Sequence, residues 1–153
     1  YFSHPARDFA ATDEALRLRR TATAVAITWK GPRIDAATKT RRELELPLPA
    51  GAAAAGASAT LDRWTELLEA LGFRPVREVA KHRRTATLDR QAAAVEVAVD
   101  RVAGLGDFVE LETRADAPQQ LAAARARIES LAHDLGCRGA ERRSYLELLL
   151  ASG

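Results

Sequence analysis

Hydrophobic and polar residues alternate along several short segments of this chain, which is the period-two pattern of β-strands with one apolar face. In residues 15–20 (ALRLRR), leucines alternate with arginines. Residues 24–31 (AVAITWKG) and 38–46 (TKTRRELEL) continue the pattern, and the Gly-Pro pair at 31–32 indicates a turn between them. Three further runs alternate in the same way, at residues 75–88, 93–102 and 106–113. The pattern predicts consecutive antiparallel strands.

Other segments repeat their apolar residues at the spacing of an α-helix. Residues 60–71 form the first, with Thr60 as the predicted N-cap and Gly72 as the stop. Residues 118–135 form the second, and the sequence SYLE at 144–147 is a capping box that predicts a short C-terminal helix.

Residues 48–59 (LPAGAAAAGASA) have low complexity and are interrupted by Gly51 and Gly56. Glycine disfavours a helix interior, so we predict a surface connection here and not a helix. The helices need an apolar sheet face to pack on, and the aliphatic faces of the strands supply it. The predicted fold class is therefore α+β, with helices on the apolar side of an antiparallel sheet.

The polar faces of the predicted strands carry ionised residues on every strand. The bases are Arg17, Arg19, Lys30, Lys39, Arg41, Lys81 and Arg83, and the acids are Glu43, Glu45, Glu96, Asp100, Glu110 and Glu112. One interpretation is an open sheet whose outer face is covered by cross-strand ion pairs. The other is a closed antiparallel β-tunnel with a charged interior and helices packed outside. Bases dominate the first strands and acids the last, which favours a tunnel for a polyphosphate with a divalent metal, because bases bind phosphate oxygens and carboxylates bind hard cations.

Composition narrows the classes of protein further. A length of 153 residues suits one domain, which we predict over residues 1–153. The formal net charge of +2 gives no argument for nucleic acid, and no apolar run approaches the ~18 residues of a membrane span. The only cysteine, Cys137, cannot form an internal disulfide, which fits a cytoplasmic protein. The chain begins at Tyr1 and contains no methionine, so we expect that an upstream segment is missing from it.

The order of these motifs resembles that of the triphosphate tunnel (CYTH) proteins, and within them the class IV adenylyl cyclase-like branch. The resemblance covers nearly the whole chain. It runs through HPARDFAATDEALRLRR, TWKGP, TKTRRELEL, LGFRPVREVAKHRR, VAVDRVAGLGDFVELE and SYLELLL. The family implies a closed antiparallel tunnel that binds a nucleoside or inorganic triphosphate together with Mg²⁺ or Mn²⁺.

The resemblance also implies roles for individual residues. It gives catalytic roles to Lys81 and Asp100. The implied triphosphate-binding residues are Arg17, Arg19, Lys30, Lys39, Arg41, Lys81 and Arg83, and the implied metal-binding residues are Glu110, Glu112, Glu43 and Glu45. The family begins with a Glu-x-Glu-x-Lys strand, and no such motif occurs in this chain. We therefore expect the metal site of this chain to be incomplete.

Three functions are compatible with these residues. The leading hypothesis is a metal-dependent adenylyl cyclase that converts ATP to cyclic AMP and pyrophosphate. The second is hydrolysis of an inorganic or organic triphosphate in the same tunnel, and the third is non-catalytic binding of a polyphosphate or nucleotide. Each predicts a triphosphate partner, with neither nucleic acid nor membrane, and each leaves a homodimer open.

Overall fold

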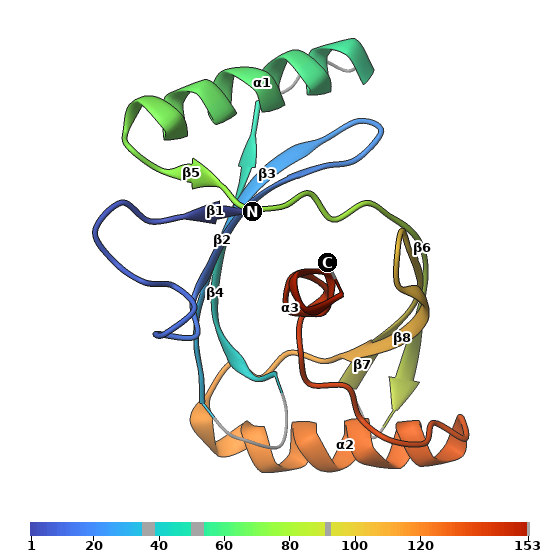
Figure 1. Ribbon diagram of the computed structural model, residues 1–153. Coiled ribbons are helices and arrows are strands. Elements are labelled where there is room, and N and C mark those ends of the chain that lie inside the picture. The colour runs from blue at the N-terminus through green and yellow to red at the C-terminus, as the bar shows by residue number, and fades with distance from the viewer. Residues whose placement is uncertain (35–38, 50–53, 91–92, 153) are drawn as a thin grey trace. The chain divides into compact units, whose positions relative to one another are not determined.

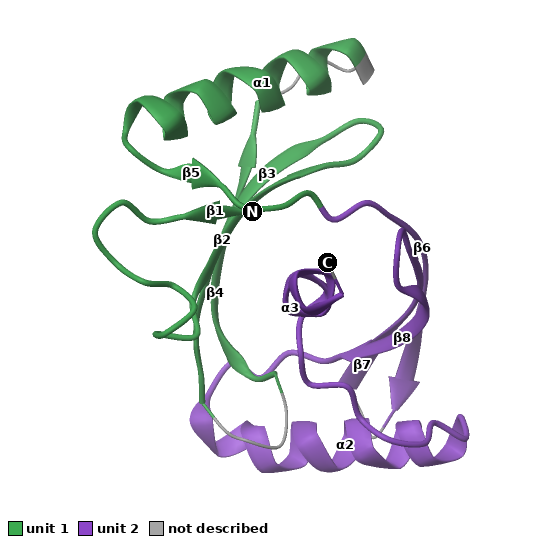
Figure 2. Cartoon of the chain, viewed as in Figure 1, with its two compact units in different colours: residues 1–78 green, residues 79–153 purple. Residues whose placement is uncertain are grey.

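The computed structural model describes residues 1–34, 39–49, 54–90 and 93–152 (Figure 1). The chain divides into two compact units, residues 1–78 and residues 79–153 (Figure 2). Each unit combines an antiparallel sheet with helices, which confirms the α+β class. The closing of the two sheets into one tunnel and the single domain over residues 1–153 stay predictions, and each unit is described by itself.

The first unit contains a five-stranded sheet in the order β4-β3-β2-β1-β5, in which every pairing is antiparallel. Its elements are β1 (Phe2–Ser3), β2 (Ala15–Arg20), β3 (Val25–Arg33), β4 (Arg41–Leu48), α1 (Ala54–Ala70) and β5 (Arg74–Pro75). The strands predicted at 15–20, 24–31 and 38–46 are thus confirmed, although the third begins only at Arg41. The turn predicted at Gly31-Pro32 is wrong, because β3 continues through both residues to Arg33. Thr38 lies outside the described residues. The two-residue strands β1 and β5 were not predicted.

Helix α1 packs on the aliphatic face of this sheet. Val25 and Leu48 form a buried cluster with Ala57 of the helix, whose exposure is 0%. A second cluster joins Leu16 of β2 to Leu68 of the helix. The alternation of β2 and β3 therefore supplies the apolar surface that the helix requires, as the sequence predicts.

The predicted connection at 48–59 is wrong in its second half, because α1 already begins at Ala54. Alanine has the highest helix propensity, and burial of Ala57 against the sheet offsets the unfavourable Gly56. Thr60 is consequently not an N-cap but lies inside the helix, where its hydroxyl donates to the carbonyl of Pro49 at 3.1 Å. Residues 50–53 of the same segment lie outside the described part of the chain.

The second unit contains a three-stranded antiparallel sheet in the order β6-β7-β8. Its elements are β6 (Lys81–Arg90), β7 (Ala93–Val102), β8 (Gly106–Glu112), the 3-10 helix η1 (Pro118–Gln120), α2 (Leu121–Asp134) and α3 (Tyr145–Ala151). The strand predicted at 75–88 begins only at Lys81, and the helix predicted at 118–135 opens with a 3-10 turn. The capping box at Ser144 is present. Among the described helices, none is long and apolar enough to cross a bilayer.

Helices α2 and α3 are tied to different faces of this sheet. Arg90, on the aliphatic face of β6, donates to Ser130 of α2 at 2.8 Å and forms an ion pair with Asp134. Tyr145 of α3 instead bonds to Asp100, on the charged face. The prediction of helices packed on the apolar side therefore holds for α1 and α2 but not for α3, because a tyrosine at the start of α3 can bond with a buried carboxylate.

Candidate functional site

The predicted site residues of the second unit share one face of its sheet. The register places Arg83 of β6 opposite Asp100 of β7, and Asp100 opposite Phe108 of β8. Because alternate residues of a strand point to the same side, Lys81 and Glu110 lie on this face as well. We call it the charged face of β6–β8, and it carries Lys81, Arg83, Glu96, Asp100, Glu110 and Glu112.

Asp100 is the centre of this face, with a side chain that is 0% exposed. Its Oδ2 accepts from the Lys81 ammonium at 2.9 Å, from Arg83 Nη2 at 2.5 Å and from the Tyr145 hydroxyl at 2.9 Å. Its Oδ1 accepts from Arg83 Nε at 2.7 Å. The same arginine also donates to Glu110. A buried carboxylate is thus fully hydrogen-bonded, as a buried charge requires.

These bonds set the protonation states of the cluster. Burial alone would raise the pKa of Asp100, but hydrogen bonds from Arg83, Lys81 and Tyr145 outweigh it, so the pKa lies well below its ordinary value. Burial lowers the pKa of Lys81, and its hydrogen bond to Asp100 opposes that effect. Burial, the charge of Glu110 and the bond to Asp100 raise the pKa of Tyr145. Asp100 is therefore ionised and Tyr145 neutral at neutral pH.

Two of the predicted metal ligands, Glu110 and Glu112, lie on the same face. Glu112 is directly opposite Glu96 across the strands, and neither of these two forms an ion pair within the described residues. In the part of the chain that the structure describes, no three His, Cys, Asp or Glu residues are grouped to hold a metal. Mg²⁺ commonly uses one or two carboxylates and takes its other ligands from water and substrate phosphates. Metal binding by Glu110 and Glu112 therefore stays a prediction.

The first unit has a charged face of its own, on β2, β3 and β4. Lys30 forms an ion pair with Glu43 at 2.6 Å, and Arg19 forms one with Glu45 at 3.3 Å. Glu45 also accepts from the fully buried hydroxyl of Thr28 at 2.8 Å. The predicted ligands Glu43 and Glu45 are thus engaged with bases of their own unit, and their role at a metal stays a prediction.

Arg17 differs from the other bases of this face. It forms no ion pair with any residue that the structure describes, and its only hydrogen-bond partner there is the Tyr1 hydroxyl at 3.5 Å. Its Nε is buried and has no partner. Buried donors in native proteins are almost always satisfied. The Nε of Arg17 is therefore a donor whose acceptor is not among the described residues.

Two other predicted triphosphate ligands are placed differently. Lys39 precedes β4 and has partners of its own. The Arg41 guanidinium donates to the carbonyls of Asp13 and Gly31, at 3.3 and 3.4 Å, and lies 3.9 Å from the Asp13 carboxylate. Asp13 also binds the Arg33 side chain, at 2.7 and 2.8 Å. Arg41 is therefore held at the base of the loop before β2, and its contact with a triphosphate stays a prediction.

Asp13 allows a test of this arrangement. Its φ of 55° lies in the left-handed region, which asparagine tolerates, so Asp13→Asn should preserve the backbone and remove the charge. Hydrogen bonding from Arg33 lowers the pKa of Asp13 below its ordinary 3.8, so its contribution to stability is complete above that value and is lost as the pH falls through the native pKa. We expect a lower urea midpoint at neutral pH and a smaller difference at an acidic pH below 3.8, because the stabilisation is lost as the pH falls through the native pKa.

Asp62→Asn is the control for this experiment, because Asp62 is exposed on α1 and has no partner among the described residues. Its midpoint should equal that of the wild type at both pH values. An unchanged midpoint for Asp13→Asn at neutral pH would show that the Asp13 carboxylate does not stabilise the loop.

Sequence reasoning missed Tyr145 and Asp13 as partners of the predicted site residues. Tyr145 follows a recognisable capping box, which predicts where a helix begins but not which strand it contacts. Asp13 lies in a loop, where side-chain direction has no periodicity. Both contacts depend on tertiary packing, for which the sequence carries no local signal.

The comparisons with known proteins agree with this fold. The CYTH domain family model matches residues 1–145. A Methanocaldococcus jannaschii protein, named "Putative adenylate cyclase MJ0240", is 34% identical over 112 residues, which are 73% of this chain and 56% of that protein. The chain thus spans about half the length of this curated relative.

A solved structure has the same fold as this chain. The PH1819 protein from Pyrococcus horikoshii OT3 is 38% identical and superposes with a TM-score of 0.86, covering 100% of this chain and 82% of that one. The family model matches all three strands of each charged face. The chain therefore belongs to the CYTH domain family.

Proposed function

We propose that this chain binds ATP and a divalent metal and acts as an adenylyl cyclase, releasing cyclic AMP and pyrophosphate. Membership of the CYTH family supports a triphosphate ligand, and the name of the M. jannaschii relative supports the cyclase reaction. One observation carries the proposal: the charged faces leave charge of both signs without a partner. Arg17 lacks a described carboxylate, while Glu96 and Glu112 face each other without a described base.

On each face by itself, a phosphate would supply an acceptor for Arg17, and a metal would supply a cation for Glu96 and Glu112. Guanidinium and ammonium groups bind phosphate oxygens through charge-assisted hydrogen bonds. Two like charges directly opposite on neighbouring strands repel each other, so Glu96 and Glu112 would gain from a cation between them. Lys81 uses one of its three N–H donors on Asp100, which leaves two for phosphate oxygens.

Asp100 acts on the bases and not on the substrate in this proposal. A carboxylate that accepts four hydrogen bonds and has a lowered pKa is a poor proton acceptor at neutral pH. Its buried charge instead fixes the direction of the Lys81 ammonium and the Arg83 guanidinium. We therefore assign Asp100 to positioning, and Lys81 to direct contact with the phosphate oxygens.

The reaction is an in-line displacement at the α-phosphorus. The ribose 3′-oxygen forms the new bond, the bond from the α-phosphorus to the bridging oxygen breaks, and pyrophosphate leaves. Most of the catalysis is positioning and charge neutralisation, which Lys81 and Arg83 would provide on the charged face of β6–β8. Mg²⁺ or Mn²⁺ held by Glu110 and Glu112 would lower the pKa of the 3′-hydroxyl and stabilise the leaving oxygens.

Product analysis tests the proposal. The chain is incubated with ATP or with inorganic triphosphate, each with Mg²⁺ or Mn²⁺, and the products are followed by ³¹P NMR. We expect cyclic AMP and pyrophosphate in equal amounts from ATP, with turnover at least ~10-fold lower in Lys81→Ala, which loses a charged donor. Orthophosphate release from inorganic triphosphate, without cyclic AMP from ATP, would favour a triphosphatase, and binding without turnover would favour a non-catalytic binder.

A further inference from the structure

We infer that Tyr145 is a positioning residue of the triphosphate site. Helix α3 lies on the charged face of β6–β8 and holds the Tyr145 hydroxyl against Asp100. The inference rests on the proposed function, because it concerns how Lys81 and Arg83 are presented to a triphosphate. In this assignment Tyr145 does not contact the phosphates. It acts through Asp100.

The start of α3 is fixed immediately before Tyr145. The Ser144 side chain accepts from the backbone N–H of Glu147 at 3.2 Å, and the Glu147 carboxylate accepts from the backbone N–H of Ser144 at 2.6 Å. This reciprocal capping box sets the first turn of the helix and therefore the direction of the residue that follows Ser144. Tyr145 is thus placed at a defined point and does not lie on a frayed chain end.

The other end of α3 is anchored to the same sheet. Leu149 is 6% exposed and packs against the turn between β7 and β8. Gly104 in that turn has a φ of 79°, and a Cβ there would lie 3.4 Å from Leu149 Cδ2. The helix is therefore held at both ends against the sheet that carries Asp100.

The Tyr145 ring contacts two residues of the charged face. Its centroid lies 5.1 Å from that of Phe108, and the Lys81 ammonium lies 5.2 Å from the Tyr145 centroid, within the range of a cation–π contact. The ring therefore touches the same ammonium that its hydroxyl helps to direct. With the ring fixed, the hydroxyl donates to Asp100 Oδ2 at 2.9 Å.

The hydroxyl has a role that a further base could not fill. Three donors meet at Asp100 Oδ2, and of these Tyr145 is the neutral one. It restrains the carboxylate without adding positive charge to the cluster. Without the Tyr145 hydroxyl, the Asp100 carboxylate is free to turn towards either base. The Lys81 ammonium and the Arg83 guanidinium then lose their fixed positions relative to each other.

Tyr145→Phe isolates this hydroxyl, because the aromatic ring and its packing remain. We expect the affinity for inorganic triphosphate, measured by titration calorimetry, to fall about 10-fold, since hydrogen bonds to charged groups are among the stronger ones in proteins. Leu150→Ala is the matched control, because Leu150 lies on the same helix, is 53% exposed, and alanine preserves the helix. Its affinity should equal that of the wild type.

A second measurement reads the geometry without any ligand. The Arg83 Nε proton, which donates to Asp100, should exchange slowly with solvent in ¹⁵N-labelled wild type and several-fold faster in Tyr145→Phe, with Arg83→Lys assigning the resonance. A purely packing role for Tyr145 would leave that exchange rate unchanged in Tyr145→Phe, and this result overturns the inference. Faster exchange with unchanged triphosphate affinity also overturns it, because the bond would then be irrelevant to the ligand.

The two measurements separate this inference from the proposed function. If the wild type does not bind inorganic triphosphate, the proposed function fails, and with it the role of Tyr145 towards that ligand, whatever the exchange rates. If the wild type binds and Tyr145→Phe is weakened with faster Arg83 exchange while Leu150→Ala is not, the inference stands, and the product analysis alone decides which reaction follows.

Discussion

Replacing Asp100 by asparagine should lower the free energy of unfolding by about 3–5 kcal/mol, the usual cost of removing one partner from a buried ion pair. The side chain is 0% exposed and accepts from Lys81 and Arg83. Asparagine keeps the shape but not the charge, so two partly buried cations would face a neutral group. Chemical denaturation in urea at neutral pH, read from the far-ultraviolet circular dichroism, measures the change.

The effect of Asp100→Asn should depend on pH in a defined direction. The native pKa of Asp100 lies below its ordinary 3.8, so the unfolded chain binds the proton more readily than the native one. The stabilisation from the carboxylate is therefore complete above about pH 3.8 and is lost as the pH falls through the native pKa. The stability curves of wild type and variant should run parallel at neutral pH and converge in acid.

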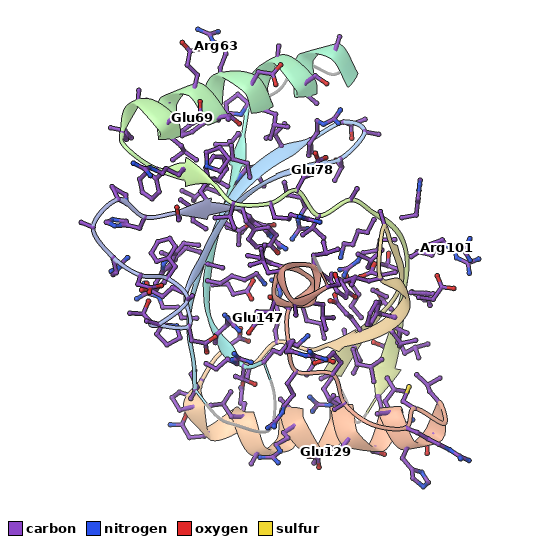
Figure 3. All side chains as sticks on the ribbon, viewed as in Figure 1. Arg63, Glu69, Glu78, Arg101, Glu129 and Glu147 are labelled. Atoms are coloured by element: carbon purple, nitrogen blue, oxygen red, sulfur yellow. The ribbon has the colours of Figure 1, made fainter. Side chains whose placement is uncertain are left out.

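Asp107→Asn is the matched control for this substitution. Asp107 pairs with Arg101 on the opposite face of the same sheet, at 2.9 Å, but the two side chains are 61% and 77% exposed. Figure 3 shows Arg101 pointing away from the strands. Exposed pairs contribute little because water screens them. The free energy of unfolding of Asp107→Asn should equal that of the wild type. If Asp100→Asn is also as stable as the wild type, the buried cluster does not stabilise the second unit.

The charged faces could be predicted from sequence because a strand has only two sides. Once Lys81 and Arg83 are placed two residues apart on β6, they must share a face, and the β6–β7 register then brings Asp100 opposite Arg83. The same argument placed Glu110 and Glu112 together on β8. Period two carries this information locally, so no tertiary knowledge was needed.

The parts that could not be predicted depend on packing between distant segments. Ala57 is helical because it fits against Val25 and Leu48, although its neighbour Gly56 disfavours a helix. The position of α3 depends on a bond between Tyr145 and Asp100, which are separated by 45 residues. In both places tertiary contact overrides the local preference, as helix propensity alone is a weak guide.

Arg17 and Asp100 should give opposite outcomes, which separates a binding group from a structural one. Asp100 is surrounded by partners, so its loss should act on stability. Arg17 has no described carboxylate partner and a buried Nε without an acceptor, so its loss should relieve an unsatisfied donor. We expect Arg17→Ala to unfold at the wild-type temperature or above it.

Arg17→Ala should weaken the binding of inorganic triphosphate by about 10- to 100-fold, because hydrogen bonds to charged groups contribute roughly 1.5–3 kcal/mol. In the proposed complex the phosphate oxygens are the acceptors that the Arg17 guanidinium lacks. Titration calorimetry gives the dissociation constant. The loss should be smaller in ~1 M salt than in ~0.1 M salt, because added ions screen the attraction between the Arg17 guanidinium and the phosphates.

Arg63→Ala is the control for Arg17→Ala, since it removes the same charge from a surface position. Arg63 is exposed on α1, and Figure 3 shows it pointing away from the helix. Its affinity for inorganic triphosphate should equal that of the wild type at both salt concentrations. If Arg63→Ala and Arg17→Ala weaken binding equally, the attraction comes from net charge alone, and Arg17 is not a ligand of the phosphates. If Arg17→Ala leaves the affinity unchanged but lowers the unfolding temperature, Arg17 is a structural residue, and the charged face of β2, β3 and β4 does not bind the triphosphate through it.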